Sequence, residues 1–224
     1  ASVTYADNRI TGDVLTVSGT ATFPDKNVGT ARTVTASSIT LTGTDAANYT
    51  QNTTATTTAN ITARALAVTV SASDKTYDRL SSATVTYADN RITGDVFTVS
   101  GTATFPDKNV GTARTVTASS ITLTGTDAAN YTQNTTATTT ASITRRTLTV
   151  TAAANDKTYD GNNTATVTLS DDRVTGDVLT VSRTAATFPD KNAGTARTVT
   201  VTGITIAGTD SGNYTQNTTA TTTA

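Results

Sequence analysis

The sequence predicts an all-β protein made of tandem immunoglobulin-like β-sandwich domains, with about seven short strands in each. Three observations predict this fold. Thr makes up more than a quarter of the chain, and Thr, Val and Ile suit a pleated, half-buried sheet. Apolar and polar residues alternate over short runs, with turn residues every 8–12 positions. The chain also repeats itself with a period of about 82 residues, which suits a small autonomous domain better than a solenoid coil.

The repeat is close to exact between the first two copies. The segment that begins at Val3 returns at Val85, and the only difference is Leu15 against Phe97. A more divergent third copy begins at Val167 and carries one extra residue near position 185. We therefore expect three domains, named repeats 1, 2 and 3 below, over residues 1–60, 61–142 and 143–224.

The second copy predicts the strands of one domain. Alternating residues indicate strands at 65–72, 83–88 and 96–105, the last bent at Gly101. The run 113–125 is expected to bend near Ser119 and Ser120 and form two strands, and 130–143 is expected to form a final hairpin. The residues expected to face the core are Leu66, Val68, Val70, Val85, Phe97, Val99 and Phe105.

A short motif in each copy suggests how the sandwich is pinned. Asp127 and Tyr131 are spaced as in the tyrosine corner of immunoglobulin-like domains, where the hydroxyl bonds to nearby backbone. The same spacing occurs in the other copies. The predicted corner residues are Asp45, Tyr49, Asp127, Tyr131, Asp210 and Tyr214.

Repeat 1 lacks the lead segment that opens the other two copies at Ile61 and Ile143. A domain without its first strand exposes a sheet edge and part of its core. The chain is therefore expected to be a window from a longer array, or a subunit whose missing strand comes from a neighbour. The links between copies contain no Gly or Pro, so we expect neighbouring domains to hold a restricted angle.

Composition excludes several functions. The chain has no Cys and no His, which removes the usual thiol nucleophile, the usual general base and the best transition-metal ligands. The net charge is −1 without a basic run, which argues against nucleic-acid binding, and no stretch is apolar enough to span a membrane. We expect no enzyme activity and no required cofactor.

Three motifs together resemble a known family. These are KTYDG at 157–161, FPDKNVGTARTVT at 105–117 and GTDAANYT at 125–132. They look like the YDG-type repeat of very large secreted bacterial adhesins, often of the filamentous-haemagglutinin, two-partner-secretion kind. Copy two departs from this pattern, with Arg79 at the position of Gly161. The resemblance implies an extracellular or bacterial cell-surface stalk and no catalytic residues.

Several loops contain side chains that could form a site. Calcium could stiffen the junctions through Asp74, Asp78, Asp156 and Asp160, although Asp and Asn more often cap turns by bonding their own backbone. Asn48 and Asn52 match N-x-T glycosylation acceptors.

The lysines of these loops have two interpretations. Lys75 or Lys108 with Asn109 could form an isopeptide bond, but isopeptide bonds need a buried acid and these lysines are expected in polar loops. We therefore interpret Lys26, Lys108 and Lys191 as exposed loop charges that contribute little to stability.

Three functions compete. The preferred one is a structural spacer in an adhesin or matrix fibre, with further copies of the repeat as neighbours and the host or cell-surface ligand held by other domains. The first alternative is a glycan- or protein-binding module, which exposed aromatic residues would favour. The second is a filament subunit in which neighbours donate the missing strand.

Overall fold

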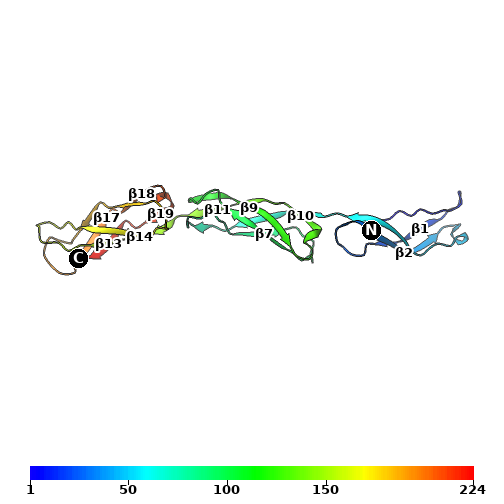
Figure 1. The fold of residues 1–224 in the computed structure, drawn as a ribbon, viewed down its shortest axis with the longest axis horizontal. Coiled ribbons are helices and arrows are strands. Elements are labelled where there is room, and N and C mark those ends of the chain that lie inside the picture. Colours follow the sequence, from blue (N-terminus) through cyan, green and yellow to red (C-terminus); the bar gives the residue numbers. More distant parts are fainter. The chain divides into compact units, whose positions relative to one another are not determined.

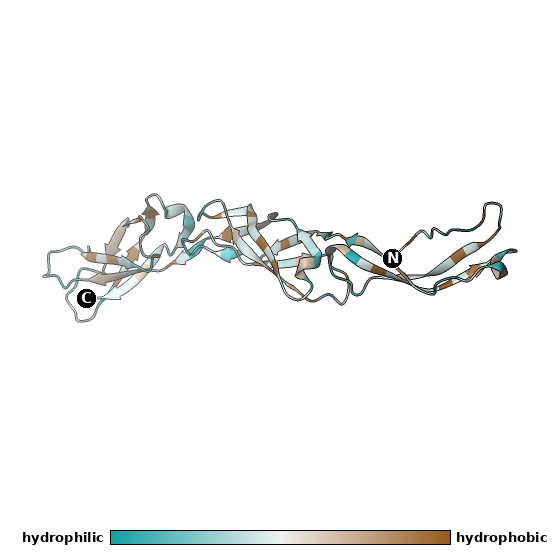
Figure 2. Cartoon of the chain, turned by 45° about the vertical axis from the view of Figure 1, so that its right-hand side comes forward, coloured by the Kyte–Doolittle hydropathy of each residue, from teal (hydrophilic) through white to brown (hydrophobic).

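The computed structural model describes all 224 residues and contains strands and three short 3-10 turns, with no α-helix (Figure 1). The all-β prediction is confirmed. No helix is long and apolar enough to cross a membrane. Apolar residues alternate with polar ones along many strands (Figure 2), as the composition and patterning predict.

Repeat 1 contains one antiparallel sheet with the strand order β1-β2-β3. The register of β1 against β2 shifts between Ser18 and Thr20, so a bulge lies at Gly19. The elements are β1 (Thr16–Thr22), β2 (Gly29–Thr42), the 3-10 turn η1 (Ala46–Asn48) and β3 (Ala55–Ile61).

Repeat 2 adds the lead segment and forms three sheets, with strand orders β10-β4, β5-β7 and β6-β11-β9-β8. Its elements are β4 (Arg64–Leu66), β5 (Val68–Ala72), β6 (Lys75–Thr76), β7 (Val85–Asp89), β8 (Thr98–Thr104), β9 (Gly111–Thr124), η2 (Ala128–Asn130), β10 (Tyr131–Gln133) and β11 (Ala137–Thr144). Its buried apolar residues include Leu66, Val68, Phe97, Phe105, Val116 and Ile121.

Repeat 3 forms four sheets, with strand orders β12-β19, β13-β14, β15-β18 and β16-β17-β20. Its elements are β12 (Arg146–Leu148), β13 (Val150–Ala154), β14 (Val167–Asp171), β15 (Thr180–Ser182), β16 (Ala185–Thr187), β17 (Thr198–Thr202), β18 (Thr205–Ala207), η3 (Ser211–Asn213), β19 (Tyr214–Gln216) and β20 (Thr219–Thr223).

The final hairpin predicted over 130–143 is wrong. Strand β10 pairs in parallel with β4 of the lead, whereas β11 pairs with β9 and β6. Asn134 lies between β10 and β11, and its side chain accepts a hydrogen bond from the Val68 N–H and donates one to the Val68 carbonyl, at 2.8 and 3.1 Å. This pair of bonds holds the end of β10 against the lead segment.

Two strand boundaries also differ from the prediction. The run 113–125 forms one strand, β9, although Ser120 has a positive φ of 52°. In repeat 3 the equivalent residue is Gly203, with φ of 66°, and there the run does divide into β17 and β18. The predicted strand 65–72 is interrupted at Ala67, so that β4 and β5 join different sheets.

The lead segment decides whether two other segments become strands. Residues 85–89 and 131–133 form β7 and β10 in repeat 2, where they pair with β5 and β4. The identical residues 3–7 and 49–51 of repeat 1 lie outside any strand. Since the sequence is the same, the pairing partner and not local propensity makes these segments strands.

By density of contacts the chain divides into two compact units. Unit 1 contains 1–68, 89–100 and 122–134, and unit 2 contains 69–88, 101–121 and 135–224. The division passes through repeat 2, so each junction between consecutive repeats lies inside one unit. We call these junction 1, between repeats 1 and 2, and junction 2, between repeats 2 and 3.

Candidate functional site: the junctions between repeats

Each repeat carries the same loop after its Phe-Pro pair, named here the DKN loop (25–27, 107–109 and 190–192). In the first copy, Asp25 accepts a hydrogen bond from the Asn27 N–H at 2.8 Å and pairs with Arg32 at 2.5 Å. The equivalent ion pairs are 2.6 Å in repeat 2 and 2.7 Å in repeat 3. These local bonds fix the loop in the same way in all three copies.

A second arrangement, shared by the three copies, binds the segment around each predicted corner Tyr to an earlier turn of the same repeat. The Tyr131 hydroxyl accepts from the Ile92 N–H at 2.9 Å and donates to Asp95 at 2.6 Å. Asp127 accepts from the Val96 N–H at 2.8 Å. The predicted corner residues therefore do bind a turn, but the bonded amide lies 39 residues earlier and not in the adjacent backbone.

The other two copies have the same arrangement, with Asp13, Asp45 and Tyr49 in repeat 1. In repeat 3 the equivalent residues are Asp177, Asp210 and Tyr214. In every copy, one carboxylate oxygen of each Asp is used inside the repeat. We call the two carboxylates of one copy its acceptor pair.

At junction 1, Lys26 of repeat 1 lies between the acceptor pair of repeat 2. Its ammonium nitrogen is 2.6 Å from Asp95 Oδ1 and 2.6 Å from Asp127 Oδ1. These are the oxygens that the bonds within the repeat leave free. One ammonium with three donors can serve both carboxylates at once.

The neighbouring asparagines add a second contact at junction 1. Asn130 accepts a hydrogen bond from the Val28 N–H at 2.9 Å and donates one to Asn27 Oδ1 at 3.2 Å. A backbone donor at the loop is thus satisfied by a side chain of the next repeat. The DKN loop of one copy is complementary to the turns of the following copy.

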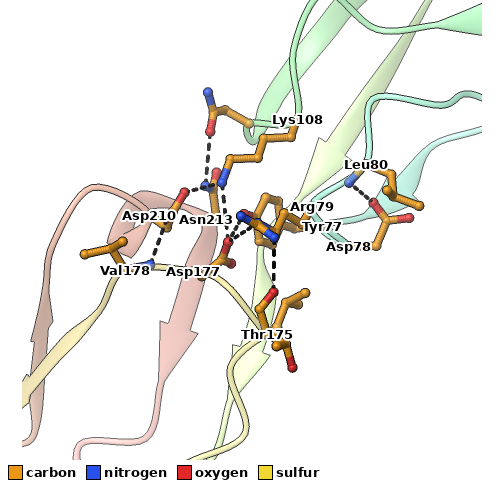
Figure 3. Close-up of polar contacts among 12 residues, drawn as sticks. Tyr77, Asp78, Arg79, Leu80, Lys108, Thr175, Asp177, Val178, Asp210 and Asn213 are labelled. Carbon is orange, nitrogen blue, oxygen red and sulfur yellow. Dashed lines mark hydrogen bonds and ion pairs between the residues drawn. The ribbon is translucent and has the colours of Figure 1, made fainter.

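Junction 2 repeats these contacts with equivalent residues (Figure 3). Lys108 is 2.5 Å from Asp210 Oδ1 and 3.3 Å from Asp177 Oδ1. The Val110 N–H donates to Asn213 at 2.9 Å, and Asn213 donates to Asn109 at 3.1 Å. Five equivalent side chains and the same backbone N–H therefore make equivalent contacts at both junctions.

Junction 2 also includes residues of the lead segment. The Tyr77 hydroxyl donates to Asp177 at 3.0 Å, and Arg79 pairs with the same carboxylate at 3.2 Å while donating to the Thr175 carbonyl. Tyr77 is 1% exposed and packs edge-on against Tyr214, with ring centroids 5.5 Å apart. Arg79 keeps the positive φ of the Gly it replaces, at 71°, so the turn after Asp78 is retained.

The ion pairs shift the acidity of the groups that form them. Lys26 holds the pKa of both Asp95 and Asp127 below the usual value, and Lys108 does the same for Asp210. The carboxylates in turn raise the pKa of both lysines. Burial, followed by its bond to Asp177, raises the pKa of Tyr214 to about 12. Asp95, Asp127 and Asp210 are therefore ionised, and Lys26 and Lys108 protonated, at neutral pH.

The acidic residues proposed as calcium ligands lie apart. Asp74 accepts a hydrogen bond from the Ser142 N–H, and Asp78 and Asp160 pair with Lys75 and Lys157 at 2.7 Å each. Asp156 lines a hollow beside the third DKN loop. No group of three or more acidic residues that could hold a metal ion is present.

From the sequence, the DKN lysines are interpreted as exposed loop charges, and the Lys26 side chain is indeed 58% exposed, but two of the three lysines are not unpaired. Lys26 and Lys108 pair with carboxylates of the following repeat, about 70 and 100 residues away. Neither Lys108 nor Lys75 lies in an isopeptide arrangement, since Asn109 bonds Asn213 and Lys75 bonds Asp78 and two carbonyls. The sequence did contain one indication of this pairing, because the DKN loop is the same in all three copies.

The fold and these junctions define a class of protein: a tandem all-β repeat protein in which each copy presents a basic loop to an acidic pair on the next. A family model described as the YDG domain matches residues 1–59, 62–141 and 144–223, so the chain belongs to the YDG domain family. No curated protein and no solved structure matches the chain.

Proposed function

We propose that these repeats are a structural spacer in a bacterial extracellular adhesin or surface fibre, which projects a binding tip or links cells. The observation that carries this proposal is the recurrence of one set of contacts at both junctions. A lysine bridging two carboxylates and an asparagine bonding backbone resist bending more than a Gly/Ser linker does. The last strand and the next lead strand are separated by only two residues at junction 1 and one at junction 2.

Two features support a spacer over a binding module. Of the aromatic residues, only Tyr159 is among the large apolar side chains that are strongly exposed, and binding surfaces usually present several. Repeats 1 and 2 are nearly identical, so the second copy lengthens the chain without adding new kinds of side chain. The resemblance to YDG repeats of secreted adhesins supports the extracellular location.

The proposal is tested on cells of the source organism. Antibodies raised against this chain should label intact cells, and the native polypeptide should have a denatured mass far above 22.9 kDa. The purified chain should bind nothing on a glycan array, since the ligand belongs to other domains. Labelling only after lysis, or specific glycan binding by this chain, would contradict the spacer proposal.

One observation favours a second candidate, a strand-accepting subunit. Repeat 1 has a hollow of about 420 Å³ lined by Tyr5, Leu15, Ile39, Tyr49 and Asn52 among others. In repeat 2 the equivalent residues Tyr131 and Asn134 bond the lead segment. The hollow therefore has the chemistry to accept an extended segment like 64–72 by strand addition.

Strand donation is tested with a synthetic peptide of residues 63–73. Bound in the register of repeat 2, it would lie parallel to residues 49–51 and protect their amides from exchange. The control is the same peptide with Asp at the position of Leu66, which is 2% exposed in repeat 2. Equal binding of both peptides, or of neither, would remove this candidate.

A further inference from the structure

The face of repeat 3 around its DKN loop carries equivalents of the residues that repeat 2 uses at junction 2, with Ala193 in place of Val110 and Gly161 in place of Arg79, and they are uncovered. Tyr159 is 60% exposed, whereas its equivalent Tyr77 is 1% exposed. Lys191, Asn192 and Ala193, the equivalents of Lys108, Asn109 and Val110, are all exposed. We call this surface the Lys191 face.

The DKN loop of the Lys191 face has the same local bonds as the two occupied DKN loops. Asp190 pairs with Arg197 at 2.7 Å and accepts from the Asn192 N–H at 2.7 Å, as the equivalent residues do in the two occupied loops. No hydrogen bond or ion pair is formed by the side chains of Lys191 and Asn192 or by the Ala193 N–H. Docking would therefore cost little ordering of the loop.

Repeat 1 presents the complementary surface. Asp13 Oδ2 accepts from Tyr49, and Asp45 Oδ2 accepts from the Val14 N–H. The Oδ1 atoms, which at both junctions bind lysine, have no partner in repeat 1, and neither does the side chain of Asn48. Asp45 is half-buried and Asn48 is exposed, while their equivalents Asp210 and Asn213 are 6% and 4% exposed. We call this surface the Asp13 face.

We propose that the Lys191 face binds the Asp13 face of a second copy of this chain, head to tail. Lys191 would bridge Asp13 and Asp45, as Lys26 bridges Asp95 and Asp127. The Ala193 N–H would donate to Asn48, as the Val28 N–H donates to Asn130. Charge complementarity and two occupied examples of the same interface in one chain select this partner.

The biological meaning of this interface, end-to-end association of copies of the repeat, rests on the proposed spacer function. The interface is heterologous, so it adds copies in one direction without closing a symmetric dimer. Because no covalent link raises the local concentration of the partner, we expect a dissociation constant of about a millimolar.

The test uses two variants with one damaged face each. Lys191→Glu reverses the charge of the Lys191 face, and Asn48→Ala removes the amide of the Asp13 face. Neither side chain has a hydrogen-bond or ion-pair partner within the chain, so folding should be preserved. By sedimentation at about 0.05–1 mM the native chain should form head-to-tail oligomers, and each variant alone should associate about tenfold more weakly.

Mixing the two variants gives the decisive result. Lys191→Glu keeps its Asp13 face and Asn48→Ala keeps its Lys191 face, so the mixture should form dimers and no longer species. In a ¹⁵N-labelled Asn48→Ala chain, the Ala193 amide should shift when unlabelled Lys191→Glu is added. Arg183→Glu, the same charge change away from either face, should behave like the native chain.

Three results would overturn the proposal: a native chain that stays monomeric up to 1 mM, a mixture that associates no better than either variant, or shifts confined to Tyr5 and Tyr49–Asn52. The last result would indicate strand donation. None of these results would contradict the spacer proposal. The junctions within the chain are tested separately, by the protection of the Val28 and Val110 amides from hydrogen exchange.

Discussion

Asn130 and Asn213 illustrate how much a junction depends on the type of single residues. Each uses its carbonyl oxygen to accept a backbone N–H and its amide nitrogen to donate to an asparagine of the preceding loop. Aspartate could accept but not donate, and serine is too short to do both across this span. The asparagine side chain therefore matches both groups that the preceding DKN loop offers, a backbone N–H and an asparagine oxygen.

Tyr87 and Gly101 form another matched pair, this time within repeat 2. A Cβ placed on Gly101 would lie 2.8 Å from the Tyr87 hydroxyl and 2.8 Å from the Ser119 carbonyl oxygen. Tyr5 stands in the same relation to Gly19 in repeat 1. In repeat 3 the tyrosine is Leu169 and the glycine is Arg183, so the small residue occurs only where the hydroxyl does.

Gly101→Ala should lower the free energy of unfolding by about 1–3 kcal/mol, because the methyl group overpacks a filled site. In a Tyr87→Leu background the loss should be smaller, though not zero, since the Ser119 carbonyl stays in place. Chemical denaturation of the four proteins of this double-mutant cycle measures the coupling.

Gly212→Ala is the control for this cycle, because nothing lies within 4 Å of its added Cβ and the other two repeats carry Ala there. It should be neutral. An unchanged cost of Gly101→Ala with and without the Tyr87 hydroxyl would show that the two residues are not coupled.

At the scale of elements, each junction joins a loop to two turns that are remote in sequence. The Val28 N–H and its acceptor are 102 residues apart, and the Val110 N–H and its acceptor are 103 apart. Periodicity predicted most strands because alternation is a local property. It could not predict that β10 pairs with the lead segment, or that Lys26 and Lys108 have partners, because these depend on which elements meet in the fold.

The role of the predicted corner tyrosines could also be predicted only in part. The spacing from Asp127 to Tyr131 identified residues that pin a turn, but not the turn itself, which lies 39 residues earlier. The acceptor pair could not be found from the motif because its other member, Asp95, belongs to a different segment. Only the assembled repeat places both carboxylates beside one lysine of the preceding copy.

Lys108→Met should destabilise junction 2 by about 1 kcal/mol, because Asp177 and Asp210 lose a charged partner at a partly buried site. The measurement is thermal unfolding together with exchange of the Val110 amide, which should become faster. Lys191→Met removes the same charge from an unpaired loop and should change neither quantity in dilute solution. Equal effects of the two substitutions would contradict the role given to Lys108.

As the pH falls, the carboxylates of junction 1 should lose their contribution to stability. The folded-state pKa values of Asp95 and Asp127 lie below 3.8, whereas the unfolded value is about 3.9. Their contribution is therefore complete above about pH 4 and is lost as the pH falls through the lower folded values. In Lys26→Met both pKa values should rise, which carboxyl ¹³C titration measures. A titration that Lys26→Met leaves unchanged would show that the lysine does not bind the pair.

At the largest scale, one contact set occurs twice within residues 1–224, and equivalents of its two halves lie exposed on repeats 1 and 3. A chain built in this way can change length by gaining or losing copies, because every new copy brings both halves of the interface. Membership of the YDG domain family accounts for the repeat, and the same set of contacts joins consecutive copies at both junctions.

The most direct test of this account is amide hydrogen exchange at three equivalent positions. The Val28 and Val110 N–H groups have acceptors only in the next repeat, while the equivalent Ala193 N–H is exposed. The account predicts slow exchange at Val28 and Val110 and fast exchange at Ala193 in dilute solution. Fast exchange at all three would mean that the repeats are joined only by the covalent chain, and would contradict the central claim.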